Sequence, residues 1–135
     1  MKSRVALEVE DVQAALEAAK AEALKNSWAV AIAVVDDGGH ALGFLRLNEA
    51  APVTAKIAFG KARTAALARR ESKFYEDVVK NGRTAFLSTD LTTLEGAVPV
   101  MVAGQCVGAV GVSGVKADQD AQVATAGAQA ILARA

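Results

Sequence analysis

The feature that most constrains this chain is an apolar run over residues 28–35 that ends at the turn sequence Asp36-Asp37-Gly38-Gly39. The run is too short for a typical helix, and the two glycines supply the positive φ angles of a tight hairpin, so the pattern predicts a strand. Side chains alternate between the faces of a strand, and both faces are apolar here. We therefore expect a central strand, with helices or a partner subunit covering each face.

The remaining elements follow from apolar spacing and from turn residues. Helices are expected over about 10–26, 52 to 69 or 70, 71–81 and from 117 onward. Strands are expected over 28–35, 40–47, 96–102 and 106–113, with a further short one at 84–87, which makes about five. The order is α-β-β-α-α-(β)-β-β-α. Hairpins flanked by helices indicate an antiparallel sheet of the α+β class, in one domain over residues 1–135.

Two helices carry specific expectations about burial. The helix from residue 52 is rich in alanine and apolar on most sides, so it should be largely buried. The helix over 71–81 should point Phe74, Val78 and Val79 inward.

Cys106 lies in an apolar strand and is expected to have a structural role.

Charge and cysteine content exclude several classes of function. The 15 basic and 15 acidic residues balance to a net charge of +0 without a long like-charge block, which argues against nucleic acid and membrane surfaces as partners. No apolar run is long enough to span a bilayer, and Glu8 interrupts any export signal, so we expect a cytoplasmic protein. One cysteine and one histidine exclude an internal disulfide and multi-histidine metal sites. A metal would need carboxylates or an organic carrier.

His40 is the single imidazole, and it directly follows the first predicted turn. A neutral imidazole can ligate haem iron or act as a general base near neutral pH. The alternative is a solvated residue at the end of a strand.

Basic residues gather between positions 52 and 73, where six positive charges face one acid, Glu71. Lys61 and Arg63 lie on an otherwise apolar helix and suit a carboxylate, either a porphyrin propionate or a small organic acid. Arg46, between apolar neighbours, needs water, a carboxylate, a ligand anion or an interface partner. Asp120 can pair with such a cation across the fold, or it can stabilise the end of its own helix. The alternative for the basic residues between positions 52 and 73 is that they are solvated and pair with neighbouring Glu or Asp side chains.

Four blocks, in this order, resemble one known family. They are residues 34–40 running into Phe44-Leu45-Arg46, the helix stretch 58–65, the strand entry 96–100, and residues 107–114 followed by Gln119-Asp120. The chain resembles the GlcG/HbpS-type haem-binding (haem-degrading) family, and it is also similar to the C-terminal domain of PduO proteins. Three positions depart from the family pattern: Asn48-Glu49 replaces an Asp-Gly turn, Ala97 replaces a second glycine, and Lys116 replaces a Ser or Thr helix cap.

The resemblance implies a profilin-like antiparallel sheet flanked by helices, assembly into homo-oligomers and, for some members, haem binding or oxidative breakdown of haem. It implies His40 as the metal ligand of a haem cofactor, and Arg46, Lys61, Arg63 and Thr64 as further cofactor-binding residues. No catalytic residue is assigned.

Three functions compete at this point. The first is a haem or tetrapyrrole-binding protein that acts in haem degradation or in redox or iron handling. The second is an enzyme or accessory protein of small organic-acid catabolism that binds a carboxylate. The third is an oligomeric scaffold without a small ligand.

Overall fold

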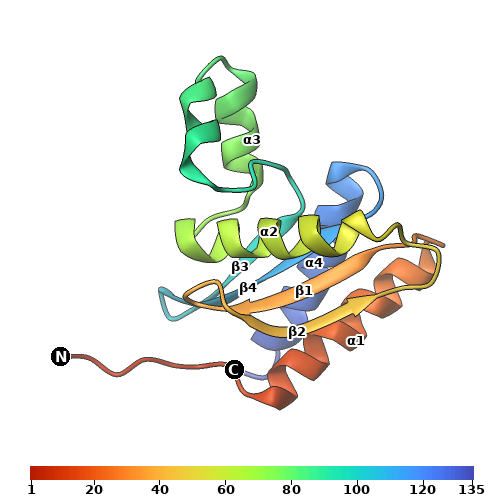
Figure 1. Ribbon diagram of the computed structural model, residues 1–135. Coiled ribbons are helices and arrows are strands. Elements are labelled where there is room, and N and C mark those ends of the chain that lie inside the picture. Colours follow the sequence, from red (N-terminus) through yellow and green to blue (C-terminus); the bar gives the residue numbers. More distant parts are fainter.

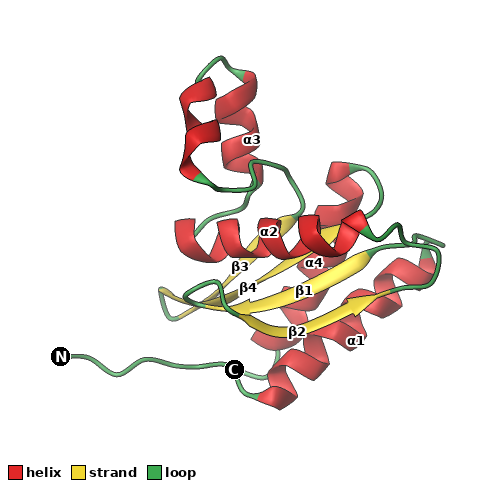
Figure 2. Cartoon of the chain, in the orientation of Figure 1, coloured by secondary structure: helices red, strands yellow, loops and turns green.

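The computed structural model describes residues 1–135. Its elements, in chain order, are α1 (Val9–Lys25), β1 (Ala31–Asp36), β2 (Ala41–Arg46), α2 (Val53–Ala68), α3 (Lys73–Lys80), the 3-10 helix η1 (Thr84–Thr89), β3 (Ala97–Val102), β4 (Gln105–Ser113) and α4 (Ala117–Leu132). The strands form one sheet in the order β2-β1-β4-β3, and every neighbouring pair is antiparallel. Helices α1 and α4 cover one face and α2 crosses the other (Figure 1; Figure 2). The predicted α+β class is confirmed.

The sheet has four strands, and the fifth strand expected at 84–87 is wrong. This segment belongs to η1, in which the hydroxyls of Ser88 and Thr89 donate to the carbonyls of Ala85 and Phe86, each three residues earlier. Short hydroxyl side chains that bond to nearby carbonyls favour turns over strands. A local hydrogen-bond pattern therefore replaces the strand pairing that the sequence suggested.

The expected central strand is β1, which is buried on both faces between β2 and β4. Val30, Ile32 and Val34 belong to the cluster under α1 and α4, whereas Ala31 and Ala33 belong to the cluster under α2. The alternation read from the sequence thus assigns each face of β1 correctly. The second cluster consists of alanine with a single valine, which lets α2 lie close to the sheet.

The segment that contains α3 and η1 projects from the sheet as an arm (Figure 1). Neither helix has a buried residue, and Phe74 is 44% exposed, so the predicted inward packing of Phe74 is wrong; Val78 and Val79 are half-buried. The aromatic rings instead pack on one another, with Tyr75 between Phe74 and Phe86. The apolar face of α3 meets η1 rather than the sheet, a choice that its periodicity alone does not reveal.

Two of the departures from the family pattern have clear structural consequences. Ala97 is buried, and its methyl group fills space in the alanine cluster under α2. Lys116 precedes α4 in an extended conformation, and its N–H donates to Oε1 of Gln119. A lysine side chain has no acceptor atom, so it cannot cap the helix as Ser or Thr does.

None of the helices combines the length and the apolar character needed to cross a membrane.

Candidate haem site at the first hairpin

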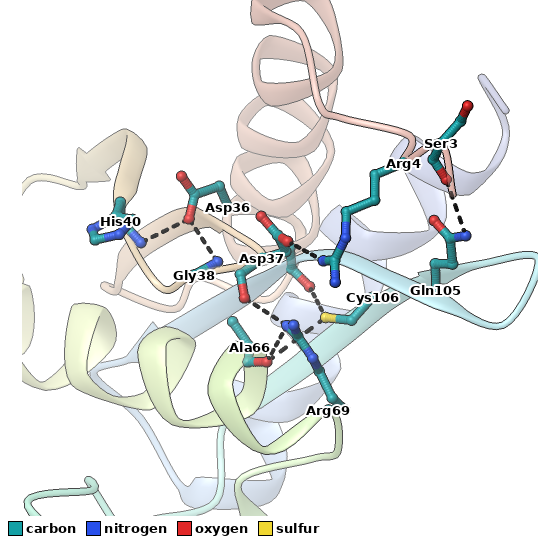
Figure 3. A network of polar contacts seen from close by, with 11 residues as sticks. Ser3, Arg4, Asp36, Asp37, Gly38, His40, Ala66, Arg69, Gln105 and Cys106 are labelled. Carbon is teal, nitrogen blue, oxygen red and sulfur yellow. Dashed lines mark hydrogen bonds and ion pairs between the residues drawn. The ribbon is translucent and has the colours of Figure 1, made fainter. Parts of the chain in front are cut away.

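The turn between β1 and β2 is held by the side chain of Asp36. Its Oδ1 accepts hydrogen bonds from the backbone N–H of Gly38 at 2.9 Å and of His40 at 3.0 Å (Figure 3). The backbone N–H of Gly39 donates to the carbonyl of Asp36. His40 is exposed, and its ring makes no hydrogen bond within the chain. Neither ring nitrogen has a hydrogen-bond partner within the chain, which agrees with both alternatives stated for His40, an iron ligand and a solvated residue at the end of a strand.

Arginines surround this turn. Arg4 pairs with the carboxylate of Asp37 at 2.9 Å, and Arg69 donates to the carbonyl of Asp37 (Figure 3). Arg63 on α2 packs under Gly39, where an added Cβ would lie 2.9 Å from its Cγ. Its guanidinium donates only to the carbonyl of Asp90, at 3.3 Å. Because Arg63 has no carboxylate partner in the chain, its charge is available to a ligand anion.

One face of β2 is apolar and uncovered. Phe44 pairs with Ala33, and Arg46 pairs with Ala31. Ala31 and Ala33 pack under α2, so Phe44 and Arg46 lie on that same face of the sheet, but β2 forms the edge beyond the cover of α2 (Figure 1). Phe44 is 48% exposed and Leu42 is 43% exposed. Leu42 lies where the register between β1 and β2 shifts, so β2 leaves two large apolar side chains exposed between His40 and Arg46.

Lys61 and Thr64 lie elsewhere, in the interior. The ammonium of Lys61 donates to Asp120 Oδ2 and to the carbonyl of Val112, both at 3.0 Å. Gly96 opens the path for this side chain, because a Cβ there would lie 2.6 Å from Lys61 Nζ. The hydroxyl of Thr64 donates to the carbonyl of Gly60 and accepts from the N–H of Thr92. Their cofactor-binding roles stay predictions, and their polar atoms already have partners.

Asp120 forms an ion pair with Lys61, which agrees with one of the two roles that the sequence suggested for it, pairing with a cation across the fold. Its carboxylate joins α4, on one face of the sheet, to Lys61 of α2 on the other face. It also accepts from the N–H of Val115 at 3.0 Å. Burial raises the pKa of Asp120, against the opposing effect of the Lys61 ammonium. This pair is a structural link between the two helix layers.

Arg46 lies at the opposite end of β2 from His40. Six residues of extended chain separate them by about 20 Å, which is more than the distance from haem iron to a propionate. Arg46 instead helps to line a cavity with Trp28 and Lys20. The structure thus brings His40 and Arg63 together and leaves Arg46 apart.

Sequence reasoning did not single out Leu42 and Phe44 as candidate site residues. Their apolar character predicts core positions, and both side chains are uncovered because β2 lies at the edge of the sheet.

No three His, Cys, Asp or Glu side chains are grouped so that they could hold a metal ion. Cys106 is buried, and its sulfur lies 3.8 Å from the carbonyl of Ala66 (Figure 3), in keeping with a structural role.

Comparison with known proteins identifies the family. Residues 7–129 match the family model described as haem degrading protein HbpS-like. The chain belongs to the HbpS-like family. Within it, the chain is 56% identical over 114 residues to protein GlcG of Escherichia coli (strain K12), covering 84% of this chain and 85% of GlcG.

Solved structures agree with this assignment. A crystal structure of HbpS superposes with a TM-score of 0.87 at 31% identity, over 96% of this chain and 92% of that chain. A crystal structure of PduOC in complex with haem superposes with a TM-score of 0.85 at 27% identity, over 93% of this chain and 95% of that chain. The HbpS-like fold therefore extends over almost the whole of this chain.

Proposed function

We propose that this protein binds haem at the first hairpin, with His40 as the iron ligand. The observation that carries the proposal is an exposed imidazole without a hydrogen bond, held by a rigid turn at the end of an uncovered apolar strand face. Membership of the HbpS-like family and the similarity to PduOC, solved in complex with haem, support the same ligand.

The residues at the hairpin fit the chemistry of haem. Histidine is a common protein ligand of haem iron, and His40 would supply it here. Leu42 and Phe44 offer an apolar surface to the macrocycle, and Arg63 offers a cation to a propionate carboxylate. The porphyrin holds the iron, so the chain needs no cluster of metal-binding side chains.

Replacing His40 with alanine is expected to weaken haem binding at least about tenfold, because the iron loses its protein ligand. Titration of the protein with haemin, followed by the Soret band, measures this change. Arg63→Gln should weaken binding by a smaller factor, since it removes one charge-assisted contact. Lys56→Gln, an exposed position on the same helix, is the matched control and should bind as the wild type does. Equal Soret titrations for wild type and His40→Ala would remove His40 from this role.

The role of the bound haem is proposed to be haem degradation or redox or iron handling, in line with the family description. The two are separated by supplying a reductant and oxygen to the haem complex. Progressive and irreversible loss of the Soret band over repeated turnovers indicates degradation. A Soret band that shifts reversibly without being lost indicates redox or iron handling.

We also propose that the protein assembles with copies of itself. Leu42 and Phe44 on β2, and Phe74 and Leu87 on the arm, are large apolar side chains with 43%, 48%, 44% and 60% exposure. These side chains form two separate pairs, one on β2 and one on the arm, and apolar side chains left exposed in groups are typical of protein interfaces. Sedimentation velocity should therefore show a species larger than a monomer, and Phe74→Glu on the arm, away from the proposed haem site, should shift the distribution toward the monomer. A monomer at all concentrations in the wild type would contradict assembly.

A further inference from the structure

We propose a second ligand site, for a small monocarboxylate with an apolar body, in a cavity at the far end of β2. The cavity has a volume of about 570 Å³, within the range of small-molecule sites. It lies where the end of α1, the entry to β1 and the turn after β2 meet. Its lining consists of Lys20, Leu24, Ser27, Trp28, Ala29, Leu45, Arg46, Leu47, Asn48 and Glu49.

The charges of the lining select the ligand's head group. Lys20 on α1 contributes to the lining, and so does Arg46, which pairs with Ala31 on the α2 face but reaches the cavity because β2 is the edge strand. No ion pair or side-chain hydrogen bond within the chain holds either cation. Glu49 is the only acid there, so the cavity has one net positive charge. A single carboxylate balances this charge, and Arg46 can receive it with two parallel hydrogen bonds.

The apolar part of the lining selects the ligand's body. Half of the lining residues are hydrophobic, and Trp28 provides the largest surface among them. Trp28 is half-buried and packs against the core under α1 and α4, so its ring is fixed. An aromatic or branched alkyl group can pack on a fixed indole at little entropic cost.

Local hydrogen bonds hold the backbone on both rims of the cavity. Ser27 and Glu49 adopt left-handed φ angles of 60° and 72°, and at Ser27 this is the usual conformation of a residue that ends a helix. Neighbouring backbone hydrogen bonds fix both rims: Trp28 N–H donates to the Ala23 carbonyl at 2.9 Å, and Leu47 N–H donates to the Val30 carbonyl at 2.9 Å. The cavity is thus held in shape before any ligand arrives.

This site is independent of the proposed haem site. His40 and the cavity lie at opposite ends of β2, about 20 Å apart along the strand. Loss of one should therefore leave the other intact.

Trp28 is the only tryptophan in the chain, so its fluorescence reports on the cavity alone. We expect phenylacetate, benzoate or 4-methylpentanoate to change this emission saturably, and 2-phenylethanol, which matches phenylacetate without the charge, to bind at least about tenfold more weakly. Arg46→Gln should weaken binding of the active acid by at least about tenfold, and Lys20→Gln by a smaller factor. Lys56→Gln, away from the cavity, is the control for a general loss of positive charge.

Far-UV circular dichroism and urea unfolding verify that Arg46→Gln remains folded. Three results would each overturn the proposal: no response to any of the three acids in fluorescence and in calorimetry, equal binding of acid and alcohol, or unchanged affinity in Arg46→Gln.

Discussion

Replacing Lys61 with methionine is expected to lower the free energy of unfolding by about 3–5 kcal/mol, because it leaves the buried carboxylate of Asp120 without its partner. The side chains of Lys61 and Asp120 are 5% and 3% exposed, and the pair joins helices on opposite faces of the sheet. Urea denaturation followed by circular dichroism measures the loss. Asp120→Asn should show a loss of similar size, since it leaves the ammonium without a counter-ion.

The double variant Lys61→Met/Asp120→Asn should recover much of this loss, because no unpaired charge remains and an amide oxygen can still accept from Val115. Lys73→Met is the matched control: it breaks the exposed pair with Asp77, whose side chains are 50% and 46% exposed, and should cost less than about 1 kcal/mol. If Lys61→Met were as stable as the wild type, the ammonium would not be needed by the fold, and its predicted role as a ligand for propionates would gain weight.

Gly111→Ala is expected to destabilise the protein by about 1–3 kcal/mol, the usual cost of adding atoms to a packed core. An added Cβ would clash with the backbone of α2 at Ala58 and Ala62 and would lie 2.8 Å from the Cβ of Ala62. Backbone atoms cannot rotate away, so α2 must move off the sheet. The loss is measured by thermal and urea unfolding.

Gly127→Ala on α4 is the comparison variant. Its added Cβ would lie 3.1 Å from the carbonyl of Ala15, a milder contact, and alanine favours a helix over glycine by about 1 kcal/mol. Gly127→Ala should therefore be close to the wild type. Equal stability of Gly111→Ala and the wild type would show that α2 does not pack as closely on β4 as described.

Local sequence patterns carried much of this fold. The apolar run that becomes β1 has an alanine face and a branched face, and each determines how closely a helix can approach. The Asp-Asp-Gly-Gly turn likewise fixed the hairpin and the place of His40, because its hydrogen bonds involve near neighbours.

Tertiary contacts decided the features that the sequence did not reveal. Lys61 lies in a charge cluster that suggests a surface, but its partner Asp120 is 59 residues away and on the other side of the sheet. Phe74 has the spacing of a core residue, yet α3 packs against η1. The cavity at Trp28 combines three segments that are separate in sequence. Such features depend on the arrangement of elements rather than on any one of them.

The single histidine allows a direct test of the proposed iron ligand. Protein labelled with ¹⁵N only in histidine, bound to ferric haem, is examined by electron–nuclear double resonance. A bond between His40 and iron predicts a strong ¹⁵N hyperfine coupling that is absent from the unlabelled complex. A haem complex without any ¹⁵N coupling would show that the iron is held by another group, and would contradict the proposal.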